Sequence, residues 1–352
     1  MSENRGSPSP ERLLDLIDAM AGRPVVLVAD LVVDRFLTGT PKRISREAPV
    51  LILSYQGERI APGGGANAAA NVIALGGRPL LLGAVGDDGN GADLLADLSA
   101  RGIDTAGVLV RPGYRTPTKV RILGGGRHSI KQQIVRYDIE DTLVLTETDR
   151  ARFVARLESW RAEGGEGLAT AILSDYGYGT VEPGFLSLLR AALGPESILL
   201  CDSRYRLGDY RGLDGATPNE EEAEALLGRP IEDAPEQLAE AGKCLRETLG
   251  AGFLLVTRGS RGMSLFEAGG ATHLPVYGTD QVADVTGAGD TVIGTFALAL
   301  AAGAAPLEAA LLANYAGGIV VMKMGTATLS RDELALAVRS DRRPIEGLQW
   351  AG

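Results

Sequence analysis

The sequence predicts an α/β fold in which a mostly parallel central sheet is covered by helices and carries a small antiparallel β lid. Apolar runs typical of buried strands alternate with helical segments along most of the chain, and this order is typical of parallel sheets covered on both faces. The 352 residues include 47 glycines and only 5% aromatic residues, which favours close packing of helices on a sheet. Two segments alternate apolar and polar residues instead, as in a sheet with one face in water.

The elements of the central layer are predicted in a regular order. A short amphipathic helix, ERLLDLIDAM, precedes a buried strand from Pro24 to Asp30 that ends in an acid. The further strands are predicted in the apolar runs RPLLLGAV, TAILSDY, SILLCDS and GFLLVTRG. The further helices are predicted in GADLLADLSARG, in EQLAEAGKCLRETLG and in two segments after Asp290. We expect residues 1–22 to form a tail and the short helix, and residues 23–345 to form one domain.

The lid is predicted from the two segments that interrupt this order, at about residues 40–60 and 117–138. In the second segment, GGGRH lies between two strand-like runs, as a hairpin turn does. A small sheet with exposed edges is a liability unless those edges are paired or covered. We therefore expect the lid to take part in a homodimer.

Charge, apolar patterning and cysteine content indicate the partners and the location to expect. The net charge is -10 and the isoelectric point is about 4.9, so a nucleic-acid partner is not expected. The uncharged stretch after Asp290 is interrupted by Gly294, Gly303 and Pro306, and we expect no membrane span. The polar start lacks the apolar block of a signal peptide, and two cysteines make no disulfide framework. These features predict a cytoplasmic protein.

The stretch DVTGAGD, Asp284 to Asp290, places a Gly-Ala-Gly turn directly before a predicted helix. Glycines let backbone N–H groups point into one space, and the helix N-terminus adds unpaired N–H groups, so such a turn binds anions. An aspartate there can accept a proton from a hydroxyl while the N–H groups hold a phosphoryl group, as phosphoryl transfer requires. The alternative is a plain helix cap, made by Asp290 or Thr286.

Two other stretches show related patterns. APGGGANAAANVIALGG, residues 61–77, is a second glycine-rich turn before a helix, with Asn67 and Asn71 on one helix face. The alternative for this stretch is tight packing of a helix on the sheet. TPNEEEAEALLG places Asn219 and Glu222 three residues apart at a helix start. The alternative there is a capped helix with solvated acids.

Together these stretches resemble the ribokinase-like (PfkB) family of sugar kinases, over roughly Val25 to Leu334. GGGANAAANVIALGG is similar to the N-terminal signature of the family, and DVTGAGDTVIGTFALAL is similar to its C-terminal signature. The resemblance is to a kinase domain only. It implies a ribokinase-like three-layer fold, transfer of the γ-phosphoryl group of ATP to a sugar hydroxyl, and Mg²⁺ as a cofactor.

The resemblance also implies roles for particular residues. Asp290 is implied as the base that deprotonates the acceptor hydroxyl. The N–H groups implied as the anion hole are those of Gly287, Ala288 and Gly289. Asn219 and Glu222 match an Asn-x-x-Glu motif that organises magnesium and phosphates, with Glu222 reaching Mg²⁺ through water. The positions matching nucleotide-binding positions of the family are Thr257, Gly259 and Asn314. Positions often near a monovalent cation are matched by Asp284 and Thr286, which admits K⁺ as a further cofactor.

Within the family, the chain resembles the D-glycero-D-manno-heptose-7-phosphate kinases. The similar stretches are VADLVVDRF, RISREAPV, the lid segment ending in IVRYD, LSDYGYG, and the run from DVTGAGDTVIG to GTATLS. The sugar-binding residues implied by this resemblance are Asp30, Asp34, Gly64, Gly65 and Asn67. The alternative for Asp34 is a surface acid paired with Arg35.

Two departures from those kinases concern the sugar phosphate. Tyr178 stands where they usually have Lys, and Asp202-Ser203-Arg204 stands where they usually have Asp-Pro-Lys. We expect Arg204, with Lys119 and Arg136 of the lid, to supply cations for a sugar phosphate. The alternative for the two lid cations is solvated surface charge. A kinase for another sugar or sugar phosphate, and a non-catalytic binding protein on the same fold, therefore stay open.

Overall fold

The computed structural model describes residues 7–126, 131–163, 170–278 and 283–351. A long central sheet confirms the predicted α/β class. Its strands are β1 (Pro24–Ile44), β3 (Arg78–Gly86), β4 (Val108–Arg111), β7 (Thr170–Asp175), β8 (Ile198–Ser203), β9 (Gly215–Ala216), β10 (Phe253–Thr257), β11 (Met263–Glu267), β12 (Gly270–Leu274) and β13 (Gln349–Ala351). Their order across the sheet is β13-β12-β11-β10-β9-β8-β7-β1-β3-β4. From β10 to β4 all neighbours are parallel, and β11 to β13 extend the sheet in antiparallel pairs.

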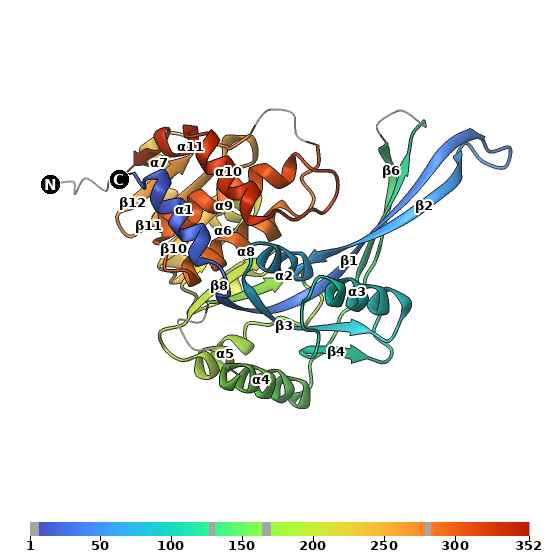
Figure 1. Cartoon of the computed structure of the whole chain (residues 1–352), viewed down its shortest axis with the longest axis horizontal. Coiled ribbons are helices and arrows are strands. Elements are labelled where there is room, and N and C mark those ends of the chain that lie inside the picture. Colours follow the sequence, from blue (N-terminus) through green and yellow to red (C-terminus); the bar gives the residue numbers. More distant parts are fainter. Residues whose placement is uncertain (1–6, 127–130, 164–169, 279–282, 352) are drawn as a thin grey trace.

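Helices cover both faces of the sheet, which gives the three layers expected (Figure 1). One face is covered by α1 (Pro10–Ala19), α2 (Gly65–Ala74), α3 (Gly89–Ala100), α8 (Ala288–Ala301), α9 (Pro306–Val321), α10 (Arg331–Ser340) and α11 (Arg343–Glu346). The other is covered by α4 (Glu147–Ala162), α5 (Phe185–Leu193), α6 (Glu220–Leu227) and α7 (Pro235–Leu249). In β1, Val25 and Leu27 pack in the first core and Val26 and Val28 in the second, because successive side chains of a strand point to opposite faces.

We expected strand β1 to end at Asp30, but it continues to Ile44. Its first part, through Asp30, pairs with β3 and β7 in the central sheet. The part from Leu31 onward leaves that sheet and pairs with β2 (Leu51–Gly64) and β5 (Thr118–Gly124). The strand continues past Asp30 because its backbone goes on pairing with β2 and β5. The Asp30 carboxylate is not at a strand end and instead accepts backbone N–H groups of the loop after β7. One continuous strand thus belongs to both the central sheet and the lid.

The lid consists of the second part of β1 with β2, β5 and β6 (Gln132–Ile139). It stands out from the body of the molecule at the upper right of Figure 1. Strands β5 and β6 form the predicted antiparallel hairpin, although residues 127–130 of its turn lie outside the described residues. The pairing of β1 with β5 is parallel, so the lid is a mixed sheet, whereas we expected a wholly antiparallel one.

The packed unit is wider than the expected residues 23–345. Leu13, Leu16 and Ile17 of α1 lie in the same core as α9 and α10, and β13 pairs with β12. Residues 1–6 of the expected tail lie outside the described residues. In the part of the chain that the structure describes, no helix is both long enough and apolar enough to cross a bilayer.

Candidate active site

A cavity of about 350 Å³ opens at the carboxyl ends of the parallel strands, the edge where open α/β sheets bind ligands. Strands β7, β8 and β10 and the N-termini of α6 and α8 contribute its wall. The lining residues are Asp175, Tyr176, Asp202, Arg204, Thr217, Asn219, Glu222, Thr257, Val285, Gly287, Gly289 and Asp290. Six of the residues predicted for catalysis, nucleotide or magnesium binding thus lie on one cavity, together with Arg204.

Asp290 lies in the first turn of α8 and is only 3% exposed. The Tyr176 hydroxyl donates to its Oδ1 at 2.7 Å, and Asn67 Nδ2 donates to its Oδ2 at 3.2 Å. Burial raises the pKa of Asp290 to about 7, against the opposing effect of those two hydrogen bonds. A carboxylate with a pKa near the working pH suits a general base. The plain-cap alternative is wrong, because the N-cap residue of α8 is Gly287 and no side chain caps the helix.

The turn before α8 requires glycine at position 287. Its φ is +76°, and a Cβ there would lie 2.5 Å from Asn67 Nδ2. Gly287 and Gly289 line the cavity, next to the first turn of a helix, whose N–H groups have no intrahelical acceptor. The N–H of Ala288 donates to the Val285 carbonyl at 3.2 Å. The Ala288 N–H is therefore already used within the turn. Anion binding by the N–H groups of Gly287 and Gly289 stays a prediction.

The stretch at residues 61–77 packs tightly on the sheet, as its alternative predicted, and also places Asn67 beside Asp290. Gly65 packs tightly, since a Cβ there would lie 2.1 Å from the Ala29 Cβ. Asn67 is nevertheless directed into the site, where its Nδ2 also donates to the Gly287 carbonyl at 3.0 Å. Asn71 Nδ2 donates to Asn67 Oδ1 at 3.2 Å, which fixes the orientation of the Asn67 amide. Contact of a sugar with Gly64, Gly65 or Asn67 stays a prediction.

Asp30 does not fit the expected contact with a sugar hydroxyl. Its side chain is fully buried, and it accepts hydrogen bonds from the backbone N–H groups of Tyr176, Tyr178 and Thr180 at 2.8–2.9 Å. A carboxylate with three backbone donors and no exposure holds the loop after β7 and is closed to a ligand. Its effect on the site is indirect, through the position of Tyr176.

Asp34 is buried, and the alternative that pairs it with Arg35 on the surface is wrong. It forms an ion pair with Arg121 of β5 and accepts a hydrogen bond from Thr326 Oγ1 at 2.8 Å. Arg35 instead pairs with Glu58 of β2 at 3.1 Å and with Asp93 of α3 at 2.6 Å. We missed Arg121 in the sequence, although the two-residue period of a strand places it on the same face as Lys119.

The three cations expected to meet a sugar phosphate differ in exposure. Lys119 is half-buried, with Nζ 5.0 Å from the centre of the Tyr176 ring. Burial lowers the pKa of Lys119; Asp34 opposes this, while Arg204 and Arg136 add to it. Arg204 is exposed and lines the cavity. Arg136 is exposed and forms an ion pair with Asp138 at 2.8 Å. The alternative of a solvated surface charge therefore fits Arg136 better than it fits Lys119.

Asn219 and Glu222 form a capping box at the start of α6. Asn219 Oδ1 accepts the N–H of Glu222, and Glu222 Oε2 accepts the N–H of Asn219, each at 2.9 Å. The capped helix of the alternative is thus present, but both residues also line the cavity. Burial raises the pKa of Glu222 and that of nearby Asp202. We did not predict Asp202 as a site residue.

Carboxylate oxygens in this cavity are the donors that Mg²⁺ prefers. Within the described residues, no group of three or more His, Cys, Asp or Glu side chains is arranged to hold a metal ion. Such a site fits an ion held mainly by water and substrate phosphates. Near the expected monovalent-cation position, Asp284 accepts hydrogen bonds from Thr286 at 2.7 and 2.9 Å and from the Gly325 N–H at 3.0 Å. The K⁺ site therefore stays a prediction.

The predicted nucleotide positions differ in their relation to the cavity. Thr257 lines it, and Gly259 begins the short 3₁₀ turn that follows, Gly259–Arg261. Asn314 is buried in α9, and its Nδ2 donates to the Pro275 carbonyl at 2.8 Å. Asn314 and Gly259 are not among the described lining residues, so their contact with a nucleotide stays a prediction.

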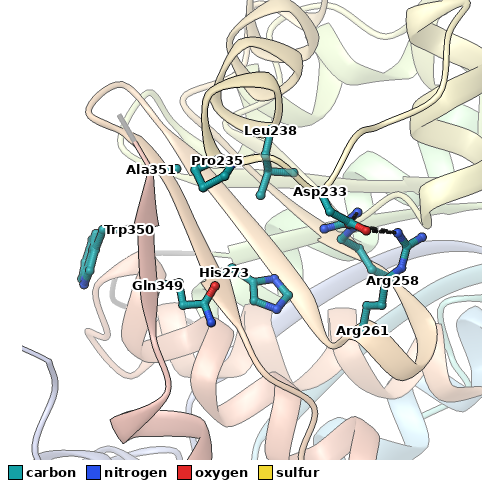
Figure 2. A pocket seen from close by; sticks show the side chains of 9 residues that line it. All are labelled: Asp233, Pro235, Leu238, Arg258, Arg261, His273, Gln349, Trp350 and Ala351. Carbon is teal, nitrogen blue, oxygen red and sulfur yellow. Dashed lines mark hydrogen bonds and ion pairs between the residues drawn. The ribbon is translucent and has the colours of Figure 1, made fainter.

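An ion-pair network lies next to Thr257 and the start of α6. Arg258 is buried and pairs with Glu220 of α6 at 2.8 Å and with Asp233 at 2.5 Å. Arg261 pairs with the same two acids. Figure 2 shows Asp233 between the two arginines, at the edge of a second, smaller pocket of about 240 Å³ beside β12 and β13. The network ties the Thr257–Arg261 turn to the helix that carries Asn219 and Glu222.

A buried carboxylate ready to take a proton, beside a helix N-terminus open to an anion, suits phosphoryl transfer to a hydroxyl, which is the chemistry of a sugar kinase. The comparisons agree with this class. Residues 25–148 and 209–333 match the model of the pfkB family of carbohydrate kinases. The chain belongs to this family.

Curated relatives and solved structures support the assignment. The chain is 38% identical over 342 residues to the bifunctional protein HldE of Mesorhizobium japonicum and 41% identical over 329 residues to that of Azotobacter vinelandii. These matches cover 96% and 92% of the chain but only 66% and 65% of the relatives. Phosphofructokinase-2 of Escherichia coli, solved in complex with potassium, matches with a TM-score of 0.70 at 19% identity, over 90% of this chain and 98% of that one. Arabidopsis thaliana ribokinase, solved with ribose and ATP, matches with a TM-score of 0.69 at 20% identity, over 91% of this chain and 100% of that one. At these identities the structures show the ribokinase-like fold.

Proposed function

We propose that the chain transfers the γ-phosphoryl group of ATP to a hydroxyl of D-glycero-D-manno-heptose 7-phosphate. The observation that carries the proposal is the position of two cations near the base: Arg204 lines the cavity with Asp290, and Lys119 is close enough to Asp290 for their charges to interact. A sugar with a free hydroxyl at one end and a phosphate at the other matches this pairing of base and cations. The sequence resemblance to heptose-phosphate kinases, and the similarity to HldE proteins, support the same acceptor.

In the proposed reaction, Asp290 takes the proton of the acceptor hydroxyl as its oxygen attacks the γ-phosphorus. The new oxygen–phosphorus bond forms as the bond to the β,γ-bridging oxygen breaks, and ADP leaves with that electron pair. The N–H groups of Gly287 and Gly289 stabilise charge on the transferred group. Mg²⁺ neutralises phosphate charge when bound, and Glu222, through water, with Asp202 would hold it. Closure of the lid would exclude water, which would otherwise hydrolyse ATP.

Arg204 and Lys119 would replace the lysine that related kinases have at the position of Tyr178. The Tyr178 hydroxyl donates to Glu140 Oε1 at 3.1 Å and offers no charge to a phosphate. Arg204 keeps a cation, although a guanidinium binds phosphate with a different geometry from an ammonium group.

Arg204→Met is expected to raise KM for the sugar phosphate by ~10- to 100-fold, because charge-assisted hydrogen bonds contribute about 1.5–3 kcal/mol. KM for ATP is expected to change little. Arg211→Met is the matched control, since Arg211 is exposed in the same segment and contacts backbone carbonyls of Gly208 and Tyr210. An unchanged KM for the sugar phosphate in Arg204→Met would remove this residue from the phosphate site.

The acceptor is tested by ADP release from Mg-ATP with D-glycero-D-manno-heptose 7-phosphate, sedoheptulose 7-phosphate, fructose, fructose 6-phosphate, ribose and adenosine. Strong preference for the heptose phosphate is expected. Turnover only with an unphosphorylated sugar would overturn the acceptor and leave the kinase chemistry. Binding of ATP without turnover on any acceptor of the panel would count against the proposed reaction and favour a binding protein.

We also propose that the chain forms a homodimer through its lid. Apolar side chains of the lid with exposed fractions of 44–67% are Ile44, Val50, Leu51, Tyr55, Ile134, Val135 and Tyr137. So many exposed large apolar side chains on one small sheet favour a surface that a partner covers. A monomer in sedimentation at micromolar concentration would contradict the dimer.

The free cysteines Cys201 and Cys244 suit a reducing compartment, which supports a cytoplasmic location.

A further inference from the structure

Tyr176 connects the buried Asp30 to the base. Its backbone N–H donates to Asp30 Oδ2 at 2.9 Å, and its hydroxyl donates to Asp290 Oδ1 at 2.7 Å. The backbone N–H groups of Tyr178 and Thr180 donate to the same Asp30 carboxylate. Three anchors along five residues fix the loop after β7, so the Tyr176 ring enters the site from a rigid support.

The charges that face Asp290 come from several elements and do not all favour its ionised form. Asp34 of β1 disfavours a negative charge on Asp290, while Lys119 of β5 favours it. Asp202 of β8 is close enough to Asp290 for a negative charge on one carboxylate to disfavour a negative charge on the other. The charged groups that surround Asp202 in turn include Glu222 of α6 and Arg204. A buried carboxylate in such surroundings needs hydrogen-bond donors to stay ionised.

Tyr176 can serve as such a donor only while its hydroxyl is protonated. Burial, with Asp290 and Asp202 nearby, raises the pKa of Tyr176 well above its usual value. The hydroxyl therefore keeps its proton over the whole working range of pH and donates to Asp290 throughout. Since Tyr176 binds Oδ1 and Asn67 binds Oδ2, the carboxylate is held at both oxygens, and each oxygen keeps a second lone pair for an incoming hydroxyl.

We propose that Tyr176 is a positioning residue for the phosphoryl transfer, whose hydroxyl keeps the Asp290 carboxylate ionised and in one orientation for proton abstraction. This inference rests on the proposed function, because it assigns the work of Tyr176 to the base of that reaction. Tyr176 belongs to the stretch LSDYGYG, and we did not predict it as a site residue.

Tyr176→Phe is expected to move the acidic limb of the pH dependence of kcat upward by about one to two pH units, the size of effect that a hydrogen bond to a charged group has. Because the base acts in its deprotonated form, kcat falls most at low pH. At pH 7 the loss is expected to be about 5- to 50-fold, with recovery as pH rises toward 9–10.

Tyr178→Phe is the matched control, since it removes a hydroxyl from the same loop that donates to Glu140 instead. Its acidic limb is expected to keep the midpoint of the parent. A purely structural role for Tyr176 would lower kcat at every pH and leave the midpoint unmoved, and that result would overturn the inference. Site-specific 3-fluorotyrosine at position 176 tests the same bond without shortening the side chain. Its more acidic phenol is a stronger donor, so the limb is expected to move downward.

An NMR titration of ¹³Cγ-labelled aspartate separates this inference from the proposed function, because it needs no turnover. Asp290→Asn identifies the Asp290 signal by its loss. A higher Asp290 pKa in Tyr176→Phe, in a chain that phosphorylates none of the panel sugars, would support the inference about the carboxylate and count against the proposed reaction. An unchanged Asp290 pKa in an active Tyr176→Phe variant would overturn the inference and leave the proposed function intact.

Discussion

Asp290→Asn is expected to lower kcat by at least ~100-fold, the contribution of a general base, while ATP still binds. The substitution keeps the shape of the side chain and a hydrogen-bond acceptor for Tyr176, but its amide cannot take the proton of a hydroxyl. Removal of a buried carboxylate whose pKa is already raised to about 7 is expected to leave the fold intact. Steady-state kinetics with Mg-ATP measure turnover, and calorimetry measures the affinity for ATP.

The matched control is Asp332→Asn, which neutralises an exposed aspartate in the first turn of another helix, α10. Both variants change the net charge equally and both place Asn near a helix N-terminus, so a shared loss would point to a general effect. A turnover in Asp290→Asn equal to that of the parent would mean that another group removes the proton. Loss of ATP affinity together with turnover would assign Asp290 to nucleotide binding.

The sequence predicted best what depends on neighbouring residues. Apolar runs gave the order of strands and helices, and the DVTGAGD stretch gave Asp290 and its glycine turn, because these patterns are local. The acid at Asp30 was read as the end of a strand and as a sugar ligand. In the structure its partners are backbone groups of Tyr176, Tyr178 and Thr180, about 150 residues away along the chain, and no local pattern specifies them.

The contacts that were missed share this cause. Tyr176 reaches Asp290 across a large separation in sequence, and Arg121 reaches Asp34 only because β5 pairs in parallel with the lid part of β1. That pairing was not expected, since polar alternation predicts a strand without naming its neighbour. Local periodicity thus defined the elements, while the supports of the site depend on how distant strands and loops meet.

Arg121→Leu is expected to lower the free energy of unfolding by about 3–5 kcal/mol, the cost of leaving one partner of a buried ion pair without the other. The side chains of Arg121 and Asp34 are only 9% and 5% exposed. After the substitution, Asp34 would keep the hydrogen bond from Thr326, but no other buried cation pairs with it among the described residues. Urea denaturation followed by circular dichroism measures the change.

Arg101→Leu is the control, because Arg101 pairs with Asp97 one helical turn away and both side chains are more exposed, at 35% and 23%. Such a pair contributes about 0.5 kcal/mol or less. A loss in Arg121→Leu no larger than in this control would contradict the buried pair. The double variant Asp34→Leu, Arg121→Leu is expected to recover much of the stability, since apolar replacement of both partners is often neutral. Recovery of stability without recovery of turnover would mean that Asp34 is retained for the sugar, and that Arg121 is present because a buried Asp34 requires a cation.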